Sequence, residues 1–287
     1  MYKPVLAVTT ALLLVAVAGC SSTPTDNGST GHDNGSDTLS LIQAAGEVSL
    51  GLPHQPPYAG VDRDGAPLGV GTALTVAIFE ALGVSKFTYN EVPYSELVPG
   101  LQGGRWDQVH LLQVTTERCE AVDFSDPIET EAFVFAVPAS DPAFAEQVMS
   151  DFVDDSGIRL GVLAGSALVK ELTTLGVPSE RLIEFPDLRS ILDGMRAGRV
   201  EATVAAASSL RLFSKDDDSF IITDTVPGTE PHTSAAAFRK GDTEIIEAFN
   251  EQLKEMQASG EFDRILKDYG FDPALPKAVT TEELCAS

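Results

Sequence analysis

Basic residues are scarce in this chain of 287 residues. It contains 19 lysines and arginines against 43 aspartates and glutamates, which gives a formal net charge of −24. Nucleic acids and anionic lipid surfaces attract proteins through positive charge, so this balance argues against both as partners. It suits a protein that must stay soluble, including in a salty medium.

Long apolar runs are absent once the first twenty residues are passed. One run over residues 5–17 follows Lys3 and ends in small residues directly before Cys20, and it is too short to span a membrane comfortably. The pattern resembles a bacterial lipoprotein signal over residues 1–20, with Cys20 as the lipidated N-terminus on the outer face of the cytoplasmic membrane. An ordinary secretory signal with an incidental cysteine is the alternative.

Cysteine is rare as well, with three in the chain. If Cys20 carries lipid, Cys119 and Cys285 remain as an even pair in an oxidising compartment, and we predict that they form a disulfide. Such a bond would close a loop of about 165 residues, for which the chain-entropy model gives at most about 5 kcal/mol. Two unpaired thiols are the alternative, because a sequence does not show which residues meet.

Residues 21–39 are dominated by Ser, Thr, Gly, Asn and Asp, which is the composition of a flexible tether. The remaining stretch of roughly 250 residues is enough for two modest lobes or one large domain. No repeat of solenoid period is visible.

Strand and helix patterns alternate along this stretch. Strand patterns cover residues 48–52, 87–92, 133–137, 159–163, 183–185 and 234–239, and helical patterns cover residues 71–82, 94–101, 167–175, 188–197, 244–259 and 265–269. Strand, helix and strand in succession imply parallel pairing with right-handed crossovers. Because the pattern restarts after an acidic linker, it predicts an α/β fold of two lobes with a cleft between them.

The stretch 114–127 is central to the interpretation of this chain. Thr115 and Thr116 can cap a short helix that carries Arg118 in its first turn, and residues 124–127 predict a turn before the next strand. An arginine beside free backbone N–H groups is well placed to bind a carboxylate, with a contribution of roughly 1.5–3 kcal/mol when water is excluded. The alternative is a surface arginine paired with a glutamate of its own helix.

Several motifs together resemble the polar amino-acid family, family 3, of ABC-importer substrate-binding proteins. They are Gly-Leu-Gln-Gly-Gly-Arg-Trp-Asp at 100–107, Thr-Glu-Arg-Cys at 116–119 with Phe-Ser-Asp-Pro at 124–127, the strand and Gly-Ser pair at 160–166, and Ser-Gly-Glu-Phe at 259–262. The resemblance covers about residues 40–287. The Arg-Cys pair, Phe-Pro-Asp at 185–187 and the tail at 280–285 resemble the ectoine- and hydroxyectoine-binding lipoproteins more narrowly.

This resemblance implies a two-lobed, type II periplasmic-binding-protein-like fold whose lobes are joined by two hinge strands and close on a ligand like a clam shell. Lobe 1 would hold residues 40–136 and 236–287, and lobe 2 would hold residues 137–235. The resemblance also implies an extracytoplasmic solute receptor, monomeric and not an enzyme. It would deliver a small zwitterion to the subunits of an ABC permease in the membrane.

The resemblance further implies a ligand-binding set drawn from both lobes: Gln55, Tyr58, Tyr94, Gln113, Thr116, Arg118, Gly165 and Ser166. Arg118 would bind the ligand carboxylate, with help from backbone N–H groups near Thr116 and Ser166. Tyr58 and Tyr94 would form aromatic walls for a delocalised cation, each contact contributing about 0.5–2 kcal/mol if water is excluded. Ordinary packing is the alternative for both tyrosines.

Some departures from the family pattern bear on the ligand. Ectoine binders typically carry a glutamate where Gln55 stands and an aromatic residue where Gln113 falls, and the span from Asp107 to Arg118 looks one residue shorter here. Amino-acid binders usually keep an aspartate for the α-ammonium near residues 205–209, which read Ala-Ala-Ala-Ser-Ser in this chain. A buried ammonium without a partner is costly, so the absence favours ectoine or hydroxyectoine, with a polar amino acid as the alternative.

The rival function is an exported dehydratase or lyase on the same scaffold, which needs an acid or base with a shifted pKa near the carboxylate site. The four histidines are poorly suited to this role. His32 lies in the tether, His110 in a predicted strand and His232 near a hinge, and His54 fits a solvated loop. No metal-ligand spacing, glycine-rich phosphate loop or nucleophile elbow occurs, so we expect no catalytic residue, metal or cofactor.

Overall fold

The computed structural model of the chain describes residues 38–141, 154, 157–225 and 231–286. The predicted signal over residues 1–20 and nearly all of the predicted tether lie outside them. Thr38 and Leu39, which fall within the predicted tether, instead begin a helix, because Leu39 and Ile42 pack against a hydrophobic core. Among the described residues, no helix is long and apolar enough to cross a membrane.

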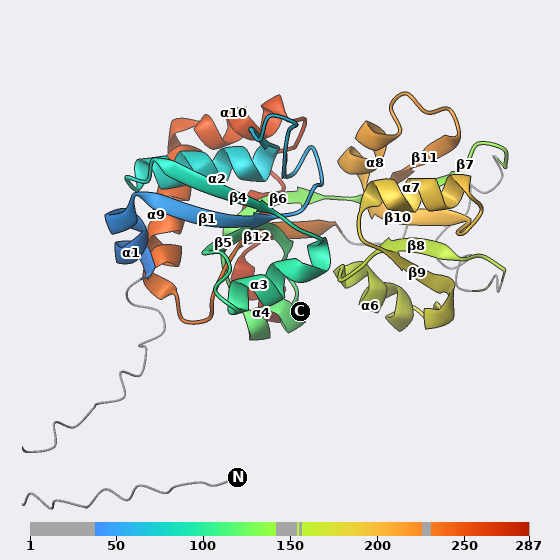
Figure 1. Cartoon of the computed structure of the whole chain (residues 1–287), viewed down its shortest axis with the longest axis horizontal. Helices are drawn as coiled ribbons and strands as arrows, with labels where there is room; N and C mark the ends of the chain where they lie inside the picture. Colours follow the sequence, from blue (N-terminus) through green and yellow to red (C-terminus); the bar gives the residue numbers. More distant parts are fainter. Residues whose placement is uncertain (1–37, 142–153, 155–156, 226–230, 287) are drawn as a thin grey trace, which may run out of the picture. The chain divides into compact units, whose positions relative to one another are not determined.

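Five strands form a first sheet in the order β4-β1-β5-β12-β6 (Figure 1). Their bounds are β1 Glu47–Leu52, β4 Lys86–Glu91, β5 Gln108–Gln113, β6 Asp123–Glu131 and β12 His232–Phe238. β1 runs parallel to β4 and β5, as the alternation of strands and helices predicted. β12 returns from far along the chain and runs antiparallel to both β5 and β6.

A second sheet has the order β11-β7-β10-β8-β9. Its strands are β7 Phe133–Pro138, β8 Leu160–Leu163, β9 Leu182–Phe185, β10 Ala202–Ala206 and β11 Phe220–Thr225. β8 runs parallel to β9 and β10, whereas β7 runs antiparallel to β10 and β11. Both sheets are therefore mixed, with a parallel part built by crossovers and an antiparallel part next to it.

Helices cover both faces of each sheet. Those of the first lobe are α1 Thr38–Ala45, α2 Val70–Ala81, α3 Leu97–Gln102, α4 Thr116–Ala121, α9 Thr243–Ser259, α10 Glu261–Asp268 and α11 Thr281–Ala286, with the short turns η1 Tyr94–Glu96 and η4 Pro276–Ala278. Those of the second lobe are α6 Ala167–Thr174, α7 Leu188–Arg196, α8 Ala207–Phe213 and the turn η3 Ser179–Arg181. A small antiparallel pair, β2 Gly60–Val61 and β3 Pro67–Leu68, lies near β4. In Figure 1, α2 and α10 lie on one side of the first sheet, and α3 and α4 lie on the other.

Each lobe has its own hydrophobic cores, which is why the chain forms two lobes. In the first lobe, α9 buries Ile245, Phe249, Leu253 and Met256 at the helical spacing that the sequence predicted. Full burial of one such side chain contributes roughly 1.5–3 kcal/mol. The second sheet packs separately, against α6 on one face and against α7 and α8 on the other.

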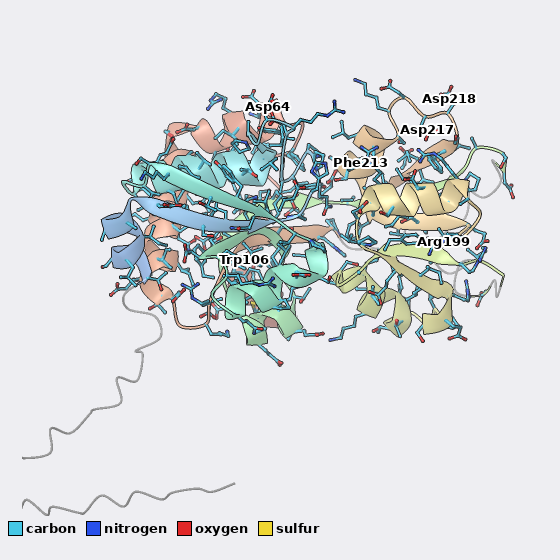
Figure 2. All side chains as sticks on the ribbon, in the orientation of Figure 1. Asp64, Trp106, Arg199, Phe213, Asp217 and Asp218 are labelled. Carbon is cyan, nitrogen blue, oxygen red and sulfur yellow. A yellow bond between two sulfur atoms is a disulfide. The ribbon has the colours of Figure 1, made fainter. Side chains whose placement is uncertain are left out.

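The 100–107 motif has a structural reason. A Cβ atom added to Gly100 would lie 1.9 Å from the ring of Trp106, so glycine alone fits there (Trp106 is labelled in Figure 2). The indole Nε1 of Trp106 donates to the carbonyl oxygen of Leu97 at 3.1 Å. Asp107 then accepts from the backbone N–H of Ser49 at 3.0 Å. The motif therefore ties α3 and the start of β5 to β1.

Cys119 in α4 and Cys285 in α11 are joined by a disulfide, with their Cα atoms 5.8 Å apart. Both residues pack at the edge of the apolar core that β5, β12 and α3 share. The bond connects the helix that carries Arg118 to the C-terminal helix.

The turn predicted over residues 124–127 is wrong, because these residues lie inside β6. β6 is the outer strand of the first sheet, and its register with β12 shifts beside Pro127. Proline is tolerated at edges and bulges because its missing N–H is not needed there. The Ser125 hydroxyl accepts from the backbone N–H of Ala236 at 3.0 Å in place of a ladder bond. The strand therefore continues to Glu131.

The chain passes from the first sheet to the second at Ala132, between β6 and β7, and returns between β11 and β12. The predicted lobe boundaries after residues 136 and 235 fall inside β7 and β12, so the crossings lie a few residues earlier than expected. The apolar patterns of these strands do not reveal which sheet they join, because that depends on pairing with distant strands.

Candidate functional site

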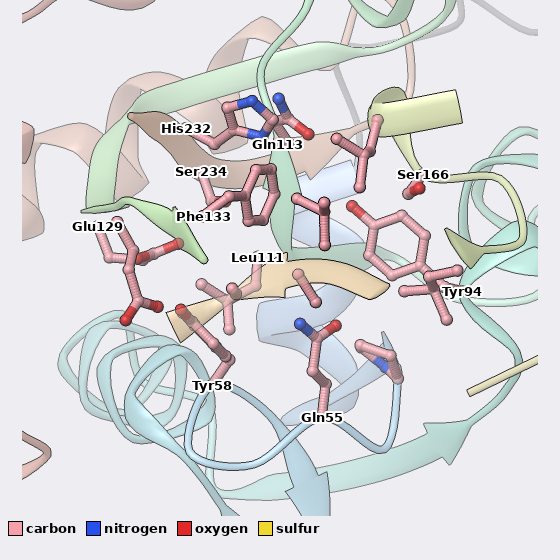
Figure 3. A pocket seen from close by; sticks show the side chains of 17 residues that line it. Gln55, Tyr58, Tyr94, Leu111, Gln113, Glu129, Phe133, Ser166, His232 and Ser234 are labelled. Carbon is pink, nitrogen blue, oxygen red and sulfur yellow. The ribbon is translucent and has the colours of Figure 1, made fainter. Parts of the chain in front are cut away.

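A cleft is lined by both lobes and by the strands that connect them (Figure 3). Five of the eight predicted ligand-binding residues line it: Gln55, Tyr58, Tyr94, Gln113 and Ser166. Thr116, Arg118 and Gly165 line an adjoining groove, which shares Gln113, Ser166 and His232 with the cleft. The structure thus brings the predicted set together around two connected hollows.

The loop after β1 places Gln55 and Tyr58. It is closed by the backbone N–H groups of Tyr58 and Ala59, which both donate to the carbonyl oxygen of Gln55 at 2.9 and 3.1 Å. The Tyr58 ring packs against Phe271 with ring centroids 5.1 Å apart, and the side chain is buried. Its hydroxyl has no hydrogen-bond partner among the described residues, although it lies at the cleft.

Arg118 lies in the first turn of α4, as predicted. Thr115 is the N-cap, and its hydroxyl accepts from the backbone N–H of Arg118 at 3.3 Å. Glu117, one of the glutamates on this helix, pairs instead with Lys170 of the second lobe at 2.7 Å.

The Arg118 guanidinium reaches across to the second lobe. It donates to the carbonyl oxygen of Gln113 at 2.8 Å and to that of Gly165 at 3.0 Å. Its Cζ lies 5.4 Å from the centroid of the Tyr94 ring, within the range of a cation–π contact. Arg118 is therefore held at the border between the cleft and the adjoining groove.

Gly165 and Ser166 follow β8 and face the first lobe. Gly165 has a φ of +76°, and a Cβ atom there would lie 2.8 Å from the Cα of Ser95, so glycine allows the lobes to approach. The Ser166 N–H, which we expected to serve the ligand, already donates to the carbonyl oxygen of Leu163 at 3.0 Å. The Ser166 hydroxyl has no hydrogen-bond partner among the described residues.

Five lining residues that were not predicted from the sequence lie on the strands that connect the lobes: Glu129, Glu131, Phe133, His232 and Ser234. Glu129 and Glu131 alternate with Thr130, so both point to one face of β6. The Glu-Thr-Glu alternation was a usable signal, but the predicted strand began only at residue 133, after the turn predicted over residues 124–127, so residues 129–131 were not assigned to a strand.

The two hinge carboxyl groups have raised pKa values. Glu129 is 3% exposed, and burial raises its pKa to about 8, although a hydrogen bond from Ser234 opposes the shift. Burial also raises the pKa of Glu131, opposed by hydrogen bonds from the N–H and hydroxyl groups of Ser208. In each carboxyl group the Oε2 atom is buried and has no partner among the described residues.

One of the histidines, His232, lines the cleft. His232 Nε2 lies 3.0 Å from the Glu171 carboxylate of α6, and its ring stands edge-on to Phe133 with centroids 3.9 Å apart. His110 is fully buried in β5, where burial lowers its pKa to about 3 and Thr72 lies within hydrogen-bond distance. His54 is exposed and lies 2.9 Å from Glu91, which suits the solvated role expected of it.

The cleft has two chemically different ends. We call Tyr94, Arg118, Gly165 and Ser166 the Arg118 end, and Tyr58, Glu129, Glu131 and Ser234 the hinge end. Figure 3 places Tyr94 and Ser166 on one side of the cleft, and Tyr58 and Glu129 on the other. A guanidinium at one end and carboxyl groups at the other suit a small ligand that carries both charges. In the described part of the chain, no group of three or more His, Cys, Asp or Glu residues is placed to hold a metal ion.

The sequence pattern of the bacterial extracellular solute-binding proteins, family 3, matches residues 49–272. This chain belongs to that family. The solute-binding protein is similar to EhuB, whose crystal structure in complex with hydroxyectoine aligns with a TM-score of 0.83 at 31% identity, over 88% of this chain and 98% of that one. The fold is therefore the two-lobed type II fold that the sequence predicted.

Two curated relatives are more distant in sequence. A probable amino-acid ABC transporter periplasmic-binding protein of Sinorhizobium fredii, y4tE, is 26% identical over 267 residues, which cover 88% of this solute-binding protein and 87% of the relative. The L-arginine-binding protein of Pseudomonas aeruginosa is 28% identical over 235 residues, covering 75% and 83%. Membership of an extracellular family places this solute-binding protein outside the cytoplasm.

Proposed function

We propose that this protein is the receptor of an ABC importer and closes its two lobes around a small zwitterion, ectoine or hydroxyectoine. The observation that carries the proposal is the cleft with a guanidinium at one end and carboxyl groups at the other. The similarity to a protein solved with hydroxyectoine supports the ligand, and the transporter relative supports the importer. The mechanism is binding and domain closure without covalent chemistry.

The ligand carboxylate would bind at the Arg118 end. A guanidinium has five N–H donors, and the bonds to Gln113 and Gly165 leave others for a carboxylate. The Ser166 hydroxyl is buried beside it and supplies a further donor. Charge-assisted bonds of this kind contribute roughly 1.5–3 kcal/mol each when water is excluded. Thr116, in the first turn of α4, faces the adjoining groove and contributes to the positive end of the helix.

The ligand cation would lie among aromatic rings. Tyr58, Tyr94 and Phe133 all line the cleft. Aromatic faces attract delocalised cations by about 0.5–2 kcal/mol per contact, depending on how much water is excluded. A flat ring that spreads its positive charge, as ectoine does, makes better use of such walls than a compact ammonium does.

The α-ammonium of an ordinary amino acid finds no carboxylate after β10. Residues 205–209 are Ala-Ala-Ala-Ser-Ser, and both serines are engaged with protein groups. Ser208 donates to Glu131, and the Ser209 hydroxyl donates to the carbonyl oxygen of Pro56 at 3.0 Å. This favours a solute without a free α-amine over a polar amino acid.

Calorimetric titration of the chain that begins after Cys20 tests the proposal. The panel is ectoine, hydroxyectoine, proline, glycine betaine, glutamine and arginine. We expect saturable binding of ectoine that is lost in Arg118→Ala. Arg264→Ala is the matched control, because Arg264 is an exposed arginine of α10 that pairs with Asp268 at 3.0 Å. Tight binding of an amino acid without binding of ectoine would contradict the ligand assignment.

A second function, an exported dehydratase or lyase, is favoured by one observation. Glu129 is buried in the cleft, and its pKa of about 8 is suited to general acid or base chemistry near neutral pH. Incubation of each panel solute with the protein, followed by chromatography of the solute, separates the two functions. Full recovery of the unchanged solute supports a transport receptor, and conversion with turnover supports an enzyme.

The proposed location is the outer face of the cytoplasmic membrane, with Cys20 lipidated and the closed lobes presented to permease subunits. Cys20 lies outside the described residues, so the proposal rests on the pattern of residues 1–20. Cys20→Ala should release the protein from the membrane fraction of expressing cells. Retention of the variant on the membrane would count against lipidation at this residue.

A further inference from the structure

We infer that Glu129 and Glu131 form a cation site on the strand that joins the two lobes, and that this site holds the positive group of the ligand while Arg118 holds its carboxylate. The inference rests on the proposed function and names a part of the binding site that the sequence motifs do not indicate. The ligand class is a zwitterion whose cation is a delocalised N–H donor group, such as the amidinium of ectoine.

Burial is the first reason for this assignment. Glu129 is 3% exposed and Tyr58 is 5% exposed, yet the Glu129 Oε2 and the Tyr58 hydroxyl have no partner among the described residues. Buried polar atoms are nearly always hydrogen-bonded, and leaving one unsatisfied is costly. Both atoms belong to residues that line the cleft, so a ligand that donates hydrogen bonds there would remove that cost.

The second reason is how the two carboxyl groups are held. Glu131 Oε1 accepts from the N–H of Ser208 at 2.7 Å and from its hydroxyl, and Ser234 hydrogen-bonds Glu129. Each carboxyl group is thereby oriented through protein donors while its Oε2 stays unpartnered. Two oriented carboxyl groups on one face of β6 form a rigid acceptor pair for a group with two or more N–H donors.

The third reason is charge complementarity across the cleft. Glu129 and Tyr58 of the hinge end lie on the opposite side of the cleft from Ser166 and Tyr94 in Figure 3. Gln55 carries an amide and residues 205–209 carry no charge, so neither can neutralise a buried cation. A charge enclosed without a counter-charge is strongly destabilising. The hinge carboxyl groups supply the counter-charge that those two positions lack.

Binding of a cation at this site would release a proton. The titratable and charged groups that face Glu129 and Glu131 are Tyr58 from the loop after β1, His232 from β12 and Arg211 from α8. With a pKa of about 8, Glu129 is about 0.9 protonated at pH 7 and about 0.1 protonated at pH 9. A cation favours the ionised carboxylate, so the proton leaves as the ligand enters.

The first test compares Glu129→Gln, Glu131→Gln and the control Glu251→Gln, an exposed glutamate of α9, in calorimetric titrations with ectoine. Glutamine keeps the size of glutamate and removes its charge. We expect each hinge variant to bind ectoine at least tenfold more weakly than the wild-type protein, and the control to bind unchanged. Unchanged binding in both hinge variants, with loss of binding in Arg118→Ala, would overturn the inference and leave the proposed function standing. Failure of the wild-type protein to bind any panel solute would reject the proposed function itself, and the inference with it.

The second test uses the wild-type protein, so it does not depend on how a variant folds. Titrations with ectoine in phosphate and in Tris buffer, which differ in ionisation enthalpy, measure the protons released. We expect release of about 0.9 proton at pH 7 and about 0.1 at pH 9, with affinity about tenfold higher at pH 9. Zero release at pH 7, or release that persists in Glu129→Gln, would show that Glu129 does not bind the cation.

Discussion

The two ends of the cleft hold their charged groups in different ways. Arg118 sits on a short helix, is only partly buried, and its guanidinium, a group that is always charged in proteins, donates to two carbonyl oxygens. Glu129 sits on a strand, is almost fully buried, and holds a proton at neutral pH. The comparison shows that one cleft can combine a permanent charge with one whose state depends on pH.

The largest expected effect concerns the covalent support of the Arg118 end. The disulfide ties α4 to α11, whereas the hinge end has no such bond. Cys119→Ser together with Cys285→Ser should lower the free energy of unfolding by about 2–5 kcal/mol in urea denaturation. Proton release on ectoine binding, which belongs to the hinge end, should persist in the folded variant. An unfolding free energy equal to that of the wild type would show that the bond does not support α4.

The next effect separates charge from geometry at the Arg118 end. Arg118→Ala should weaken ectoine binding by roughly 3 kcal/mol, or about a hundredfold, because the carboxylate loses its charge-assisted bonds. Arg118→Lys keeps the charge but lacks the planar fork, so its affinity should lie between that of the alanine variant and that of the wild type. Titration calorimetry measures both, and a lysine variant that binds like the wild type would show that charge alone is sufficient.

A third effect concerns stability at the hinge end. Because the pKa of Glu129 is raised to about 8 in the folded protein, the unfolded chain loses its proton at lower pH than the folded chain does. Stability should therefore fall as pH rises from about 5 to about 8, by up to about 1.4 kcal/mol per pH unit. Glu129→Gln should flatten this part of the profile in urea denaturation, and Glu251→Gln should not. Parallel profiles for the two variants would contradict the buried proton.

The smallest effect sharpens the role of Ser166. Its hydroxyl has no partner among the described residues, so Ser166→Ala should leave the melting temperature unchanged. It should weaken ectoine binding by about 0.5–1.5 kcal/mol, the usual contribution of one hydrogen bond. A lower melting temperature with unchanged binding would assign the hydroxyl to folding instead.

The contrast between the two ends extends to how well each could be predicted. The Arg118 end follows from local signals: Thr115 caps the helix, Arg118 occupies its first turn, and Gly165 with Ser166 follows a strand. Such features depend on residues within one turn of each other, which a sequence displays directly.

The hinge end was missed because its signals are not local. Pro127 suggested a turn, but the edge position of β6 and its shifted pairing with β12 accommodate the proline. Two glutamates that are two residues apart suggest a strand face that is exposed to solvent. Only the packing of β6 beside β12 and the second lobe buries Glu129 and makes its carboxyl group neutral.

Periodic apolar residues were enough to predict β1, β4, β7, β8, β9 and β12, the two α/β units and the amphipathic face of α9, because each depends on near neighbours, whereas β6 and β11 were not predicted. The family motifs were enough to indicate the type II fold and the position of Arg118. The tertiary structure alone decided that Ser208 meets Glu131, that Glu171 meets His232, and at which residues the chain passes between the sheets. Those contacts join residues far apart in the chain, and the burial that shifts a pKa exists only once both lobes have folded around them.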